Sequence, residues 1–220
     1  MQSEKQYIDL YTEAQQLIKE HAAPVLNEVR DKAFEDFRRQ SFPTKKVERY
    51  KYTDMQKLFE PDYGLNLNRL EIPVNPYETF KCDVPNLSTS LYFVVNDQFY
   101  SKALPKAKLN DGVIVDSLNR VATERPELVA KYYGRLANTE ADAITALNTM
   151  LAQDGLFIYV PKNVQLERTI QVINILRSDV DLMVNRRVLI VLEEGAKAQF
   201  LFCDHAADDR NFLATQVIEA

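Results

Sequence analysis

The chain has 220 residues, a net charge of −5 at pH 7 and a pI near 5.2. This length suffices to bury the core of one large domain or two small ones. The 46% hydrophobic and 27% charged fractions are ordinary for a folded protein. Nucleic-acid binders usually carry a basic face, so the acidic balance argues against that class.

Neither a targeting segment nor a membrane span is expected. The first 20 residues carry scattered charges and lack the apolar core that a signal peptide requires. No apolar run approaches the roughly 20 residues of a membrane-spanning helix. The two cysteines, Cys82 and Cys203, lie far apart, which is typical neither of a disulfide framework nor of a paired metal motif. Together these features indicate a protein of the reducing cytoplasm.

Residues 3–40 have the period of amphipathic helices. The apolar stripe of the first helix contains Tyr7, Leu10, Ala14, Leu17, Ile18 and His21. Pro24 interrupts this pattern. The stripe of a second helix follows, with Leu26, Val29, Ala33 and Phe37. A short break between two such helices predicts an antiparallel pair, and each apolar stripe must pack on the other or on a later part of the chain.

Residues 41–85 are punctuated by proline. Because proline fixes φ and lacks a backbone donor, this span predicts an extended segment wrapped over the surface rather than long regular elements. A short helix is expected over residues 53–59, with Thr53 as its cap and three apolar residues on one face.

Strand signals begin at residue 90. Runs of β-branched and aromatic residues over 91–95, 99–100 and 113–115 predict short strands, and a turn joins the first two. Helical signals resume at Ser117, a candidate N-cap, and continue with interruptions to residue 136. A further helix is predicted over 140–151.

Beyond Gly155 the chain reads as short strands joined by turns. Five strand-like runs cover residues 157–161, 169–176, 187–192, 198–202 and 214–218. Such a series is typical of a sandwich, a barrel or a β-solenoid, and the corners at 160–164 and 193–196 favour the solenoid. A solenoid needs a terminal cap, and the last run stops just before Ala220. We therefore expect these residues to be the N-terminal part of a longer protein.

Two parts of the chain resemble a known family. Residues 42–53, FPTKKVERYKYT, resemble the pattern Phe-Pro-Thr-basic-x-x-Glu-x-Trp-basic-Tyr-Thr near the start of SufD proteins, with tyrosine in place of the usual Trp. Residues 146–148, ALN, and 154–164, DGLFIYVPKNV, resemble the start of the core shared by SufB and SufD. The runs 187–191 and 194–196 resemble the part that follows. The chain is thus similar to the SufB/SufD family of iron–sulfur cluster assembly proteins, and its first motif favours the SufD branch.

The resemblance implies a fold and a role. The expected class is α+β: a helical region with a small β element over residues 1–150, then the first coils of a right-handed parallel β-helix, incomplete, over 151–220. Phe42, Tyr50 and Tyr52 are expected to anchor the extended segment on the helices. Such proteins are scaffold subunits, not enzymes, which pair with a SufB-like paralogue and bind a SufC-like ATPase through a segment outside these residues. The resemblance places the iron–sulfur cluster in the assembled complex, with no cofactor in this segment, and leaves a homodimer open.

Cys203, Asp204 and His205 are the side chains most suggestive of chemistry. Thiolate and imidazole are good iron or zinc ligands, but a metal site usually needs about four donors and no second cluster is visible. We therefore interpret Cys203 as the end of a strand and place Asp204 and His205 in the following loop. Cys82 is interpreted as structural, and His21 as a cation at a helix end. No catalytic, cofactor-binding or metal-binding residue is assigned, and contact of Cys203 or His205 with iron is left open.

The alternative function is a β-solenoid enzyme acting on polysaccharides. Such enzymes use paired carboxylic acids at a defined separation. The candidate acids fall mostly in corners, where solvation explains them: Glu167, Asp179, Asp181, Glu193 and Glu194. The sequence also lacks a phosphate-binding glycine loop and a Gly-x-Ser-x-Gly elbow, so an ATPase or hydrolase has no support in these residues.

Overall fold

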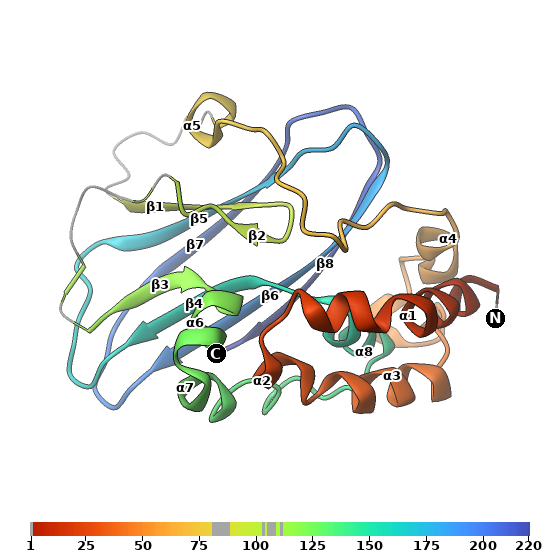
Figure 1. Ribbon diagram of the computed structural model, residues 1–220, viewed down its shortest axis with the longest axis horizontal. Coiled ribbons are helices and arrows are strands. Elements are labelled where there is room, and N and C mark those ends of the chain that lie inside the picture. The colour runs from red at the N-terminus through yellow and green to blue at the C-terminus, as the bar shows by residue number, and fades with distance from the viewer. Residues whose placement is uncertain (1, 81–88, 103, 105–108, 111) are drawn as a thin grey trace.

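The computed structural model describes residues 2–80, 89–102, 104, 109–110 and 112–220 (Figure 1). Most helices gather on one side of the molecule, and the strands form two sheets beside them. Cys82, which the sequence assigns a structural role, lies outside the described residues.

The chain begins with α1 (Gln2–Glu20), α2 (Pro24–Asn27) and α3 (Arg30–Arg39). The first predicted helix is confirmed by α1. The second is wrong as a single helix, because it is divided between α2 and α3. Residues 28–29 form a turn between them, and Asn27 Nδ2 donates to the backbone carbonyl of Lys19 at 3.0 Å, which ties the end of α2 back to α1.

In the described part of the proline-rich span, the regular elements are short: η1 (Glu48–Tyr50), α4 (Met55–Phe59) and α5 (Pro76–Thr79). The predicted cap of α4 is wrong by one residue. Asp54, not Thr53, accepts the backbone N–H of Lys57 at 3.2 Å. A carboxylate satisfies such a donor at least as well as a hydroxyl does.

The remaining helices are α6 (Leu118–Glu124), α7 (Pro126–Ala130) and α8 (Ala143–Leu151). Ser117 caps α6 as predicted, because its Oγ accepts the backbone N–H of Arg120 at 3.0 Å. Helices α1, α3, α4 and α8 surround one apolar core. Its buried side chains include Tyr11, Ile18, Phe37, Phe42, Phe59 and Leu147.

The strands described form two four-stranded sheets. The first has the order β2 (Gln98–Phe99), β1 (Thr89–Val95), β5 (Thr169–Leu176) and β7 (Phe200–Ala206). The second has the order β3 (Ile114–Ser117), β4 (Gly155–Val160), β6 (Leu182–Leu192) and β8 (Phe212–Glu219). Neighbours pair in parallel along β1–β5–β7 and β4–β6–β8, whereas β2 and β3 pair antiparallel with β1 and β4.

The expected fold class is therefore wrong. The structure is an α/β arrangement of two mixed sheets with helices, not an α+β fold that leads into the first coils of a right-handed parallel β-helix. Ile114 of β3 aligns with Tyr159 of the antiparallel β4, and Thr89 of β1 aligns with Thr169 of β5. Strands from early in the chain thus complete both sheets. Apolar periodicity locates strands but does not show which of them pair.

Strand positions follow the predicted apolar runs, and two bounds differ by more than two residues. β6 begins at Leu182, earlier than predicted. β7 continues through the predicted loop, because Asp204 and His205 align with Asn174 and Ile175 of β5. The placement of Asp204 and His205 in a loop is therefore wrong.

Two cores hold the sheets in place. The inner faces of both sheets share the first, which includes Tyr92, Val94, Leu156, Ile158, Val172 and Val188. On the outer face of the second sheet, α2, α6 and α7 cover Phe157, Leu189 and Val191. Helix α8 packs beside β6 and β8, and Asn148 of α8 donates to Thr215 Oγ1 of β8 at 2.9 Å, so β8 lies against the helical layer.

Candidate functional site

The segment that carries the family resemblance, residues 42–53, connects α3 to α4. Phe42 is 1% exposed, and its ring stacks on Phe59 with 4.4 Å between ring centroids. Tyr7 and Phe37 meet the same ring edge-on. Aromatic pairs of this kind contribute about 0.5–1.5 kcal/mol beyond the area they bury. The predicted anchoring role of Phe42 is confirmed.

The two tyrosines of this segment behave differently. Tyr50 is half-buried, and its hydroxyl donates to Asp142 Oδ2 at 2.7 Å. Tyr52 is 90% exposed, with the Lys51 ammonium 5.0 Å from its ring centroid. Anchoring by Tyr50 is confirmed, whereas anchoring by Tyr52 is wrong because its side chain faces solvent beyond the end of η1.

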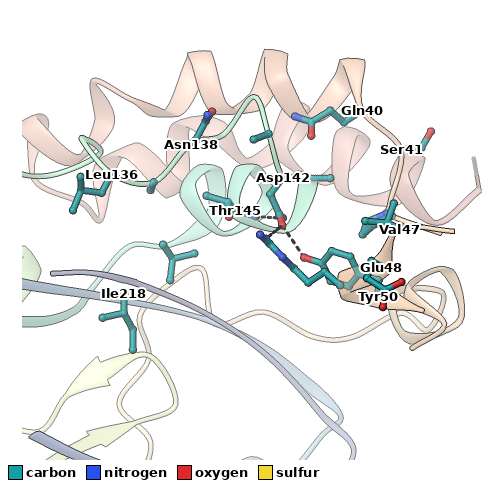
Figure 2. Close-up of a pocket in the computed structure, with 16 residues that line it drawn as sticks. Gln40, Ser41, Val47, Glu48, Tyr50, Leu136, Asn138, Asp142, Thr145 and Ile218 are labelled. Atoms are coloured by element: carbon teal, nitrogen blue, oxygen red, sulfur yellow. Dashed lines mark hydrogen bonds and ion pairs between the residues drawn. The ribbon is translucent and has the colours of Figure 1, made fainter. Parts of the chain in front are cut away.

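A groove of about 720 Å³ lies between this segment, the loop over residues 136–142 and the end of β8. Figure 2 shows Asp142 beside Tyr50 and Thr145, with Ile218 of β8 at the opposite end of the view. Apolar side chains at the groove are partly exposed, with Leu136 at 67% and Ile218 at 45%. The groove thus combines a polar end at the start of α8 with an apolar end at the sheet.

Asp142 organises the polar end. Its Oδ1 accepts the backbone N–H groups of Ile144 at 2.8 Å and Thr145 at 3.1 Å, which makes it the N-cap of α8. Its Oδ2 accepts the Tyr50 hydroxyl and, at 3.3 Å, Arg49 Nη1 (Figure 2). Asp142 is not among the residues singled out from the sequence, although an aspartate directly before an apolar helical run is a recognisable cap signal.

The hydrogen bonds of this end hold the groove wall to the start of α8. Burial raises the pKa of Tyr50, and the hydrogen bond to Asp142 raises it further, so the phenol stays protonated and donates. Both oxygens of Asp142 are engaged by four donors. A carboxylate held in this way fixes a loop and a helix end, and it has little capacity left to act as a general base.

We expect Tyr50→Phe to lower the free energy of unfolding by about 1 kcal/mol, because one hydrogen bond is lost. Asp142→Ala should cost about 2 kcal/mol, since it removes the cap of α8 and both side-chain partners. Urea denaturation followed by circular dichroism measures both. Glu48→Ala is the control, because the Glu48 side chain is 85% exposed at the same groove. Equal losses for Glu48→Ala and Asp142→Ala would contradict this account.

The loop that forms one wall of the groove is also tied to α3. Thr139 Oγ1 donates to Asp36 at 2.6 Å, and the Thr139 carbonyl accepts Gln40 Nε2 at 2.7 Å. Burial tends to raise the pKa of Asp36, but hydrogen bonds from Lys32 and Thr139 outweigh it and hold the pKa below its ordinary value. The charged carboxylate of Asp36 therefore holds the wall at its middle, and the carboxylate of Asp142 holds it at its end.

The structure separates the three residues that the sequence singled out. Cys203 and His205 lie on the outer face of β7, where Gln171 Nε2 is 3.6 Å from the Cys203 sulfur. The His205 ring meets Phe80 edge-on at 5.2 Å. Asp204 points the other way and pairs with the buried Arg186 of β6. Successive residues of a strand face opposite sides, so the three do not converge.

The acids weighed for a polysaccharide enzyme have separate partners. Glu193 accepts the Tyr132 hydroxyl, Glu194 pairs with Lys162, and Asp181 accepts both the backbone and the side chain of Asn211. Glu193 and Glu194 are neighbours in the corner after β6, and Asp181 lies just before that strand. No two of the three share a partner.

In the described part of the chain, no three His, Cys, Asp or Glu side chains gather as the ligands of a metal ion. No helix within these residues has both the length and the apolar character to cross a membrane.

Comparison with known proteins identifies the family. Residues 1–172 match the N-terminal region of SufBD proteins. The chain belongs to the SufB/SufD family. The match includes residues 42–53, α8 and the loop before it, so three of the elements that build the groove lie within the region that defines the family.

Curated SufBD relatives agree with this assignment. The iron–sulfur cluster assembly protein SufD of Bacillus subtilis is 33% identical over 121 residues, which cover 54% of this chain and 27% of the relative. A SufBD family protein of Synechocystis is 34% identical over 116 residues, covering 52% of this chain and 24% of the relative. A SufBD family protein of Arabidopsis thaliana is 27% identical over 161 residues, which cover 73% of this chain and 33% of the relative. The chain thus matches about a quarter to a third of the length of these relatives.

Proposed function

We propose that the chain works as a SufD-type scaffold subunit in iron–sulfur cluster assembly. The match of residues 1–172 to the N-terminal region of SufBD proteins carries this proposal. The likeness to SufD of Bacillus subtilis and the motif at residues 42–53 favour the SufD branch over SufB. The cluster is the cargo of the assembled complex and is not a cofactor of this segment.

A scaffold role, without catalysis by this segment, fits the chemistry of the groove. The motif residues Phe42 and Tyr50 serve packing and the positioning of a loop. Asp142, the most engaged carboxylate of the groove, has structural partners on both oxygens. Such a site presents a shaped surface to another protein. Its partners are a SufB-like paralogue and, through a segment outside these residues, a SufC-like ATPase. We place this work in the cytoplasm, because the two cysteines lie far apart in the sequence.

Co-expression tests the partners. The tagged chain is produced with the SufB-like paralogue and the SufC-like ATPase of its own genome, in all combinations, and purified at moderate salt. We expect the paralogue to be retained by the chain, and the ATPase to be retained only when the paralogue is present. Retention of neither protein, with the chain itself folded by circular dichroism, would contradict the proposal. Size-exclusion chromatography with light scattering on the chain alone shows whether it also forms a homodimer.

A further inference from the structure

The carboxylate of Glu219, at the end of β8, is 2% exposed yet fully surrounded by donors. Its Oε1 accepts the backbone N–H groups of Leu136 at 2.9 Å and Ala137 at 3.1 Å. Its Oε2 accepts the backbone N–H of Gly134 at 3.0 Å and Arg187 Nη2 at 2.6 Å. Two donors on each oxygen make a complete shell for a planar carboxylate.

The donors are held in place by contacts that do not involve Glu219. Arg187 has no exposed side-chain surface, donates through Nη1 to Thr149 Oγ1 at 2.8 Å, and lies over the Tyr133 ring at 4.9 Å. Gly134 has φ +70°, in the left-handed region, and a Cβ there would lie 3.0 Å from Val29 Cγ1. Gly134, packed against the junction of α2 and α3, therefore sets the turn of the loop. Thr149 of α8 and the Tyr133 ring fix the position of the Arg187 guanidinium.

We propose that the loop over residues 134–137 and Arg187 form a preorganised carboxylate receptor, in which Glu219 is the tethered ligand. Backbone N–H groups converging in a turn form an anion-binding concavity, and guanidinium adds a geometry that matches the two oxygens of a carboxylate. The ligand class is a small planar carboxylate.

The charge state of the bound group agrees with this geometry. Burial by itself would raise the pKa of Glu219. The charge of Arg187 and the three backbone N–H groups outweigh that effect and hold the pKa below its ordinary value. The bound group therefore stays ionised at neutral pH, and its contribution to stability is lost only as the pH falls through the lowered pKa.

The receptor controls the register of β8. Among the residues that the structure describes, this strand lies at the edge of its sheet and pairs with β6 alone, with Glu219 opposite Leu189. A slip of one residue would turn the Glu219 side chain to the other face of the sheet and empty the receptor. Because Leu136 and Ala137 also line the groove, correct pairing of β8 and correct placement of the groove wall depend on the same carboxylate.

Chemical rescue tests the receptor. In the full 220-residue chain, Glu219→Ala removes the carboxylate and leaves space for acetate. We expect the thermal midpoint to fall by roughly 10 °C, and added acetate to recover at least half of this loss in a saturable manner, compared with chloride at equal ionic strength. Glu219→Gln should also be less stable and should not respond to acetate, because the amide still fills the space. Glu194→Ala is the matched control, since Glu194 is 80% exposed and pairs with Lys162.

A folded Glu219→Ala that gains no more from acetate than the wild type and Glu194→Ala would overturn the proposal. If Glu219→Ala fails to fold, amide hydrogen exchange of the wild-type chain tests the receptor instead. The amides of Gly134, Leu136 and Ala137 are expected to exchange at least tenfold more slowly than those of exposed loops. Exchange at the rate of exposed loop amides would also overturn it.

Discussion

Replacing Gly155 with alanine should lower the free energy of unfolding by about 4 kcal/mol or more, or prevent folding altogether. Gly155 starts β4 and aligns with Arg187 of β6. A Cβ at this position would lie 1.9 Å from the Arg187 carbonyl oxygen and 2.7 Å from its carbonyl carbon. These are backbone atoms of a neighbouring strand, so relief requires β4 and β6 to separate. Urea denaturation of the variant, followed by far-ultraviolet circular dichroism, measures the loss.

Gly64→Ala is the matched control for this prediction. The nearest atom to a Cβ at Gly64 is the Asp181 carbonyl oxygen at 3.3 Å, and the backbone there is not in the left-handed region. We expect a loss of about 1 kcal/mol, because a shift of a few tenths of an ångström relieves the contact. If the two alanine variants lost the same stability, close packing of β4 on β6 would not be the cause.

Replacing Arg30 with methionine should cost about 3–5 kcal/mol of stability, because two buried carbonyl oxygens lose their donor. Arg30 begins α3 and has no exposed surface. Its guanidinium donates to the backbone carbonyls of Met150, at 3.0 Å, and Ala152, and its Nε donates to Asn27 Oδ1 at 2.7 Å. The last carbonyls of a helix have no partner within the helix, so Arg30 satisfies the end of α8 from α3. Methionine keeps much of the volume but leaves these acceptors buried and unpaired.

Arg39→Met is the control, since Arg39 ends the same helix and is exposed. Its expected effect is below about 0.5 kcal/mol. Arg30→Lys should recover only part of the loss, because an ammonium cannot reproduce the planar fork of donors. Urea denaturation ranks the three variants. If Arg30→Met lowered the free energy of unfolding no more than Arg39→Met does, the contact of Arg30 with the end of α8 would contribute nothing to stability.

Much of the local structure could be predicted because it depends on neighbours in the sequence. The apolar period located α1 and β5, and the hydroxyl of Ser117 marked the start of α6. The predicted elements were wrong where a residue far away in the sequence determines the local structure. A bond from Asn27 ties the end of the short α2 back to α1, and pairing with β5 places His205 in β7.

The candidate site was only partly visible in the sequence. Phe42 and Tyr50 stood in a recognisable motif, and Asp142 carried a cap signal that was not used. Glu219 had no such signal, because its four donors come from loop residues and a strand far earlier in the chain. A glutamate at the end of an apolar run looks like an ordinary solvated residue until the fold surrounds it.

The family, most helix and strand positions, and the anchoring of Phe42 could be read from the amino-acid sequence, since motifs and periodicity are local properties. The pairing of strands could not. The same apolar runs were compatible with a sandwich, a barrel or a solenoid, and only the tertiary structure placed β1 beside β5 and β3 beside β4. The groove and the buried carboxylate of Glu219 depend on that pairing, because they bring together residues that the chain keeps far apart.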